Sequence, residues 1–220
     1  MLNDVLPEPL PSDPLSLAAG WLAEAYRRAE QPNPNAMVLA TVSAEGQPSA
    51  RVVLCKDIVA DPGYVHFVSN YHSRKGRELA ANPRAALVFH WDHSHRQLRI
   101  EGLMCQSTPA ESDAYFAGRP WASQLGAHAS AQSEPIASRA ALIAKLDAVT
   151  RQFGEVPVSG GPKIPRPAHW GGYLLWATAV ELWVEGDARI HDRARWTREV
   201  TLDSAGRPAA GPWRGTRLQP

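Results

Sequence analysis

Residues 37–56 read MVLATVSAEGQPSARVVLCK. An apolar run, Met37–Val42, and a second run rich in valine, Ser49–Lys56, flank residues 44–47 (AEGQ), which have the composition of a turn. Two strand-like runs joined by a short turn predict an antiparallel hairpin. The hairpin therefore points to antiparallel strands as the framework of the fold.

Further strand-like segments follow along the chain. They are bounded by turn residues and lie at residues 64–69, 84–91, 97–105, 171–186 and 193–201. About six short strands interrupted by three or four helices predict a mainly β (α+β) fold, an antiparallel β-barrel with peripheral helices.

The expected helices have recognisable starts. Asp13, Ser73 and Thr108 are capping residues, and Thr108 forms a capping box with Glu111. The three helices that they begin are expected to end before Gln31, at Asn82-Pro83 and near Ala117. A longer amphipathic helix is expected over Ile136–Phe153, with Leu142, Leu146 and Val149 turned inward.

Composition limits the class of protein. The chain has 220 residues, 44% of them hydrophobic, which suits one globular domain over residues 1–220. Residues 1–11 are expected to be a flexible tail, and the Pro/Gly-rich residues 156–167 a linker. A net charge of +1 argues against a protein that coats nucleic acid or anionic membrane, so any anion site must be local.

The chain also carries signals about its compartment. Its two cysteines, Cys55 and Cys105, are expected to be reduced thiols. No apolar run approaches the roughly 18 residues of a membrane span, and the N-terminal residues lack a basic segment followed by an apolar one. We therefore expect a soluble cytoplasmic protein.

A first candidate anion site lies at the start of the second helix. Ser73, Arg74 and Lys75 place a hydroxyl, a guanidinium and an ammonium where free backbone N–H groups already favour an anion. Such a site suits a phosphomonoester, although the same triplet is compatible with a solvated turn. Arg51 and Lys56, five residues apart, would point to opposite faces of a regular strand unless a bulge intervenes or two pockets share the strand.

A second candidate site combines an aromatic ring, a cation and a hydroxyl. Tyr115 and Arg119 are four apart at the end of the third helix and project from one face, and Ser123 follows Pro120. These groups could hold another phosphate, or they could be exposed polar groups at a helix end.

A third candidate site follows Trp183. In an extended segment, alternation puts Arg189, His191 and Arg193 on one side and Asp192 on the other. Like charges so close are costly unless an anion or a carboxylate lies among them. The alternative is a polar loop between two strands.

Other catalytic patterns are missing. His90, His93 and His95 lie between two expected strands, with no further cysteine or histidine pair to complete a metal site, so we expect a solvated turn and no metal. No Gly-x-Ser-x-Gly motif occurs, and no glycine-rich phosphate loop either. A bound phosphate must then be held by side chains and a helix start.

Taken in order, these pieces resemble the pyridoxamine 5′-phosphate oxidase family, flavin enzymes that complete vitamin B6 cofactor synthesis. The resemblance runs from about Ser12 to Pro220 and rests on motifs whose joint order is specific: DPL (13–15), ATV (40–42), GQP (46–48), RVVLCK (51–56), SRK (73–75), RQ (96–97), YF (115–116), RP (119–120), SQ (123–124), QS (132–133), WGG (170–172), ELW (181–183), RIHDR (189–193) and RL (217–218).

The resemblance implies an FMN-binding split β-barrel that works as a homodimer, with two FMN sites at the subunit interface and residues 170–220 in dimerisation and the substrate site. The implied FMN contacts are Arg51, Val52, Val53, Leu54, Cys55, Lys56, Val68, Ser69, Arg74, Lys75, Gln97, Gln132, Ser133, Trp183 and Arg193. The implied clamp on the substrate phosphate is Lys56, Tyr115, Arg119 and Ser123, and the implied catalytic pair at the substrate ring is Arg189 and His191.

The implied activity is oxidation of pyridoxamine 5′-phosphate or pyridoxine 5′-phosphate to pyridoxal 5′-phosphate. A hydride would leave substrate C4′ for flavin N5, and O₂ would reoxidise the flavin to give H₂O₂. Lys56, Arg119 and Ser123 favour a phosphorylated substrate, because an apolar tricycle would leave their desolvation uncompensated.

Two alternatives stay open: the related branch that oxidises phenazine precursors, suggested by Gln219, and a non-enzymatic flavin or pyridoxal-phosphate carrier. Three departures from the family pattern stand out. Val68-Ser69 replaces a more polar pair, residues 1–11 carry no arginine or tyrosine for a lid, and residues 156–167 form a longer linker than expected.

Overall fold

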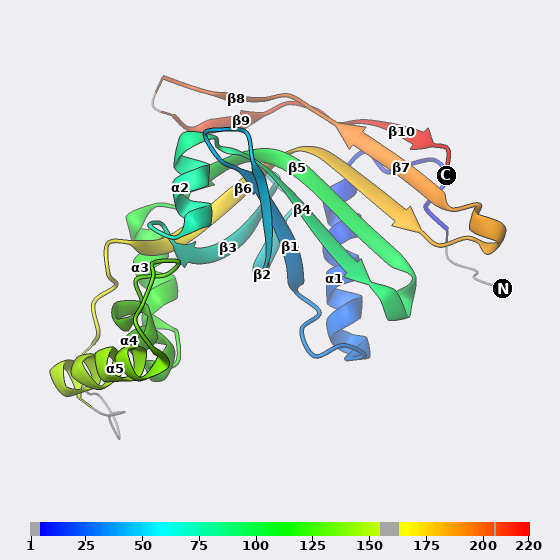
Figure 1. Ribbon diagram of the computed structural model, residues 1–220. Helices are drawn as coiled ribbons and strands as arrows, with labels where there is room; N and C mark the ends of the chain where they lie inside the picture. The colour runs from blue at the N-terminus through cyan, green and yellow to red at the C-terminus, as the bar shows by residue number, and fades with distance from the viewer. Residues whose placement is uncertain (1–4, 155–162, 205) are drawn as a thin grey trace.

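The computed structural model describes residues 5–154, 163–204 and 206–220. The chain folds around one eight-stranded antiparallel sheet with the order β10-β7-β6-β3-β2-β1-β4-β5, in which β5 also pairs with β6. This second pairing closes six strands into a barrel, and β7 and β10 extend it beyond β6 (Figure 1). The predicted antiparallel barrel with peripheral helices is confirmed.

The barrel strands are β1 Ala36–Val42, β2 Pro48–Val59, β3 Tyr64–Asn70, β4 Arg84–Trp91, β5 Arg96–Gln106 and β6 Trp170–Val184. The predicted hairpin is β1–β2, with Val38 opposite Val52. The expected strand 193–201 is two strands in the structure, β7 (Asp192–Thr197) and β8 (Val200–Leu202). The short strands β9 (Pro208–Ala210) and β10 (Arg214–Leu218) were not predicted from the sequence.

Three helices begin and end as their caps predict. They are α1 (Pro14–Arg28), α2 (Arg74–Ala81) and α3 (Pro109–Ala117). The side chain of Asp13 accepts hydrogen bonds from the first turn of α1, Ser73 accepts one from Gly76 in α2, and Thr108 and Glu111 form the expected capping box.

The remaining helices differ from the prediction. Sequence reasoning missed α4 (Trp121–Ala129), because Pro120 stands at its start and no side chain caps it. The last helix, α5, covers Arg139–Phe153 and is capped by Ser138, so it begins after Ile136. Leu142 is 38% exposed, contrary to prediction, whereas Leu146 and Val149 do pack inward, since α5 rests mainly on α4.

Two apolar clusters hold the protein together. The larger fills the barrel and the space under α1, with Phe67, Leu87 and Leu98 fully buried. The smaller is centred on Phe116 and Trp170 and connects α3, α4 and α5 to the start of β6. In Figure 1, α2 to α5 gather at one end of the barrel, and the start of β7 lies at the other.

The N-terminal residues that the structure describes are packed. Leu6 is 2% exposed and its N–H donates to Asp192 at 2.7 Å, and the carbonyl of Pro11 accepts from Trp196 Nε1 at 2.8 Å. Residues 5–11 are therefore not the free tail that their proline content suggested. Of the expected linker 156–167, residues 156–162 lie outside the described part of the chain. No helix in the described residues is long and apolar enough to cross a membrane.

Candidate functional site

A basic cluster lies where α2 meets the barrel. Its cations are Arg51 on β2 and Arg74 and Lys75 at the start of α2, with Glu78 of α2 between them. Glu78 lies 3.2 Å from Arg51 Nη2 and 2.8 Å from Arg74 Nε. Gly76 allows the close approach of α2, because a Cβ there would lie 2.0 Å from the carbonyl oxygen of Tyr71.

Lys75 connects this cluster to the segment that follows α4. Its ammonium donates to Ser73 Oγ at 3.0 Å and to Gln132 Oε1 at 2.8 Å. Burial, together with the positive charge of Arg51, lowers the pKa of Lys75 to about 8. Two of the expected cofactor contacts, 57 residues apart in sequence, thus touch directly. Ser133, next to Gln132, is exposed and has a positive φ of 74°.

Beside the cluster, a pocket of about 380 Å³ brings together residues expected to serve two different ligands. Val68, Ser69 and Gln132 come from the cofactor set, and Arg119 and Ser123 from the substrate set. The two sets were predicted separately, and the fold makes them neighbours.

Arg119 carries an unsatisfied buried group in this pocket. Its guanidinium carbon lies 4.3 Å from the ring centre of Trp170, and its Nη1 is buried without a hydrogen-bond partner among the described residues. Burial lowers the pKa of Arg119. Because a buried N–H group without an acceptor is costly, the pocket is suited to an anionic ligand that supplies one.

Tyr115 joins Arg119 through Trp170, on which its ring stacks at 6.2 Å. Lys56 Nζ lies 5.9 Å from the centre of the Tyr115 ring, so Lys56 belongs to this group and Arg51 to the basic cluster. A bulge does occur between Cys55 and Asp57, yet it leaves Lys56 on the face opposite Arg51. Arg51 and Lys56 therefore have different neighbours, Glu78 and Tyr115, as the alternative of two sites that share one strand requires.

His66 is a neighbour of this group that sequence reasoning missed. Its ring meets Tyr115 edge to face at 5.9 Å, and burial lowers its pKa. A single histidine in a strand carries no sequence signal that distinguishes it from a core residue.

The other β2 residues in the cofactor set have mixed environments. Val52 and Leu54 are 64% and 41% exposed on the outer face, whereas Cys55 is 2% exposed, and its burial raises the pKa of its thiol to about 12. Val53 is half-buried. Cys55 can therefore contact a ligand only through its backbone.

The remaining candidates form a second group at the far end of the barrel. Gln97 on β5, Trp183 on β6 and Arg193 on β7 are register partners in one row across the sheet. The ring of Trp183 lies 4.7 Å from that of His191. Arg193 donates to Oε1 of the buried Glu181 at 2.7 Å, so a carboxylate pairs with this one member of the expected group of cations.

Arg189 does not continue the alternation predicted for this segment. It lies in a 3₁₀ turn, Asp187–Arg189, with a φ of 66°, and only from Asp192 onward is the chain a strand. The positive φ at Ala188 and Arg189 turns the chain back, so that the N–H of Gly186 donates to His191 Nδ1 at 3.2 Å. Arg189 is exposed at the rim of this group.

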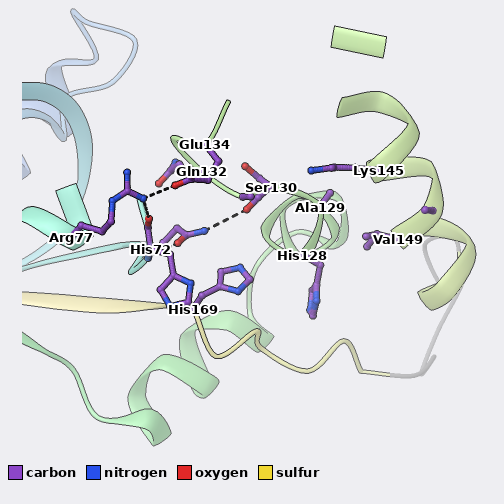
Figure 2. Close-up of a pocket in the computed structure, with 13 residues that line it drawn as sticks. His72, Arg77, His128, Ala129, Ser130, Gln132, Glu134, Lys145, Val149 and His169 are labelled. Carbon is purple, nitrogen blue, oxygen red and sulfur yellow. Dashed lines mark hydrogen bonds and ion pairs between the residues drawn. The ribbon is translucent and has the colours of Figure 1, made fainter. Parts of the chain in front are cut away.

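A larger pocket, of about 670 Å³, opens next to Gln132 (Figure 2). Figure 2 shows Lys145 and Val149 of α5 on one side of it and His72 and Arg77 on the other. None of its residues except Gln132 was a candidate from the sequence. The described residues contain no cluster of three or more His, Cys, Asp or Glu side chains that could hold a metal ion.

Comparisons with known proteins place this chain among its relatives. Residues 22–153 match the family model described as pyridoxamine 5′-phosphate oxidase, and residues 170–220 match that of the pyridoxine 5′-phosphate oxidase C-terminal dimerisation region. A pyridoxine/pyridoxamine 5′-phosphate oxidase of Cupriavidus metallidurans is 45% identical over 220 residues, all of this chain and 95% of the relative. Another, of Thermosynechococcus vestitus, is 51% identical over 187 residues, 85% of this chain and 84% of the relative.

Two solved structures share the fold. PhzG from Burkholderia lata 383, in complex with tetrahydrophenazine-1-carboxylic acid, has a TM-score of 0.83 at 30% identity, covering 99% of this chain and 98% of its own. A pyridoxamine 5′-phosphate oxidase-related, FMN binding protein from Nostoc punctiforme has a TM-score of 0.68 at 17% identity, covering 94% of this chain and 98% of its own.

Proposed function

Because the chain belongs to the pyridoxamine 5′-phosphate oxidase family, we propose that it is an FMN-dependent oxidase that makes pyridoxal 5′-phosphate. Its substrate is pyridoxamine 5′-phosphate or pyridoxine 5′-phosphate, O₂ is the acceptor and H₂O₂ the second product. We also propose a cytoplasmic location, since both cysteines are free thiols.

The observation that most directly supports this function is the pair of cationic sites that Gln132 connects. One is the basic cluster of Arg51, Arg74 and Lys75, and the other is Arg119 with its unsatisfied N–H. Two adjacent cationic sites suit two phosphate groups, that of the flavin and that of the substrate, since charge-assisted hydrogen bonds to phosphate are the strong ones.

The residues present fit FMN. Three cations and one carboxylate leave the basic cluster with a net charge of about +2, which matches a phosphate dianion. When bound, FMN supplies the two-electron acceptor of the reaction. Val68 and Ser69, which line the pocket beside the cluster, would contact the flavin, Ser69 from a buried position.

The chain's own residues would bind and orient the substrate. Arg119, Ser123, Tyr115 and Lys56 would hold its phosphate, so that binding energy away from the reacting carbon positions that carbon. His191 and Arg189 would flank the pyridine ring. The ring of His191 packs against that of Trp183.

We further propose a homodimer in which each site draws on both chains. The start of α2, with Arg74 and Lys75, follows the part of β3 that pairs with the beginning of β6, whereas Trp183 lies near the end of β6, and we infer that a site using both groups draws on two chains. Val38, Val52 and Leu54 form an exposed apolar strip on the outer face of β1 and β2. A second copy covering this strip would bury apolar surface.

The test is a turnover assay. The protein is reconstituted with FMN, pyridoxamine 5′-phosphate or pyridoxine 5′-phosphate is added under air, and aldehyde formation is followed together with peroxide release. We expect both products in equal amounts. If neither compound is converted, the proposal is wrong.

The same assay separates the alternatives. Turnover of a reduced phenazine carboxylic acid alone would indicate the chemistry suggested by the PhzG likeness, and flavin binding without any turnover would indicate a carrier. We favour the phosphorylated substrate because Lys56, Arg119 and Ser123 offer polar groups that an apolar tricycle would leave unpaired.

A further inference from the structure

Glu78 is a buried carboxylate in the middle of α2, with its side chain 6% exposed. Four groups surround it: Thr41 Oγ1 at 2.5 Å, Ser49 Oγ at 2.7 Å, Arg51 Nη2 at 3.2 Å and Arg74 Nε at 2.8 Å. None of the sequence patterns assigned it a role. Its partners include both arginines of the basic cluster.

The contacts restrain Arg51 almost completely. Nη1 donates to the carbonyl of Leu39 and to Thr41, and Nη2 donates to Ser49 and Glu78. Since a guanidinium has five N–H donors, only Nε is left for a ligand. Arg51 thus contributes a fixed positive charge at the base of the cluster.

The contact to Arg74 works differently. Glu78 takes only its Nε–H, and the four Nη hydrogens have no recorded partner among the described residues. The side chain is 57% exposed, so without Glu78 it would sample many rotamers. Held at Nε, Arg74 presents its Nη face as a planar pair of donors, the geometry that suits a phosphate.

The charge of Glu78 is constant over the working range of pH. Burial alone would raise its pKa, yet hydrogen bonds from Thr41, Ser49 and Arg74 and the charge of Arg51 lower the pKa to about 2. A buried carboxylate carries a desolvation cost that a well-packed apolar residue would avoid. A role in orienting the arginines gives a reason for its presence.

We propose that Glu78 is a positioning residue for the cofactor phosphate: it fixes Arg51 and orients Arg74 so that the phosphate meets a prepared set of donors. This inference rests on the proposed function, because it requires the basic cluster to bind the phosphate of FMN. Glu78 acts through the arginines and does not itself touch the ligand, since its charge would repel a phosphate.

The test compares the dissociation constants of FMN and riboflavin, which lacks the phosphate, by flavin fluorescence. The variants are Glu78→Ala, which removes the acceptor, and Glu78→Gln, which keeps a neutral one. A surface pocket of about 510 Å³ is lined by Arg74, Glu78 and Glu45. The matched control is Glu45→Gln, which removes one negative charge from this pocket; Glu45 accepts a hydrogen bond from Ser43 and has none with Arg51 or Arg74 among the described residues.

We expect Glu78→Ala to weaken FMN binding by about tenfold or more, the loss of one well-placed charge-assisted contact, and Glu78→Gln to lie between it and the wild type. Riboflavin binding should stay the same in both, and the control should bind FMN as the wild type does. Arg74→Ala should cost much less in the Glu78→Ala background than in the wild type, because Arg74 is no longer oriented there.

Three results would overturn the inference. Tighter FMN binding by Glu78→Gln would mean that the negative charge only opposes the ligand, an equal loss for riboflavin would mean general damage to the fold, and an unchanged cost of Arg74→Ala would mean that the two residues act independently. If Glu78→Ala does not fold, Glu78→Gln decides. A wild type that binds FMN no better than riboflavin would instead refute the proposed phosphate site.

Discussion

Replacing Arg119 with methionine should stabilise the protein and impair its function at the same time. The buried Nη1 of Arg119 has no acceptor among the described residues, and such a group costs about 1–3 kcal/mol. The replacement also loses the contact with Trp170, worth about 0.5–1 kcal/mol at a half-exposed site. Methionine has a similar length and fills the space, so we expect a net gain of about 1 kcal/mol in the free energy of unfolding.

The effect on substrate has the opposite sign. Loss of a charge-assisted contact to the substrate phosphate should cost about 1.5–3 kcal/mol, or roughly tenfold to a hundredfold in kcat/KM. Thermal unfolding of the FMN-loaded protein measures the first effect, since about 1 kcal/mol moves Tm by roughly 2–4 °C at this size. Added pyridoxal 5′-phosphate should raise the Tm of the wild type more than that of the variant.

Arg77→Met is the matched control, because Arg77 is an exposed arginine paired with Glu134 and does not line the Arg119 pocket. It should change both stability and kcat/KM little. An Arg119→Met variant that is destabilised by more than about 1 kcal/mol, with an unchanged kcat/KM, would refute the reasoning, since Arg119 would then be a structural residue.

Other predictions test the remaining parts of the site. Arg189→Ala should lower kcat/KM with FMN retained, whereas Arg74→Ala should weaken FMN retention by roughly tenfold to a hundredfold; the reverse pattern would show that the two assignments are exchanged. Because the pKa of Lys75 is about 8 instead of the ordinary 10.5, FMN affinity should fall as the pH rises through 8, and titrations that give a constant affinity would contradict this. Over the same range the unfolded chain binds this proton more tightly, so the FMN-free protein should become more stable as the pH rises, which denaturant melts can measure. Val52→Asp should yield monomers in analytical ultracentrifugation, since Val52 is 64% exposed on the apolar strip; an intact dimer would place the interface elsewhere. Phe67→Ala should cost about 3–5 kcal/mol in urea unfolding because Phe67 is fully buried in the barrel, and a loss below about 1 kcal/mol would contradict that packing.

Local features of the sequence predicted the local structure. The hairpin of residues 37–56 and the helices capped by Asp13, Ser73 and Thr108 depend on contacts within a few residues, so pattern and capping were sufficient. Where no local signal exists, prediction failed: α4 has no side-chain cap, and the exposure of Leu142 depends on how α5 meets α4.

The candidate site also has features that the sequence predicts and features that it does not. The sequence by itself determined which residue types were available for phosphate binding, namely the Ser73-Arg74-Lys75 triplet and the Tyr115, Arg119 and Ser123 group. It could not say that Lys75 meets Gln132, or that Arg119 retains an N–H without a partner. The first fact depends on two side chains that are 57 residues apart in the sequence, and the second depends on how the folded chain buries Arg119.

Tertiary structure alone decided how the candidates are grouped. Closure of the barrel through β5 and β6 places the Trp183 row at one end and the basic cluster at the other, and the bulge in β2 leaves Lys56 beside Tyr115. It also brings Arg51 of β2 to the buried Glu78, whereas the Arg74–Glu78 pair is local to α2 at a spacing of four residues. Spacing along the chain determines on which face of its own helix or strand a side chain lies. Only the pairing and register of strands that are distant in sequence determine which other side chains lie next to it.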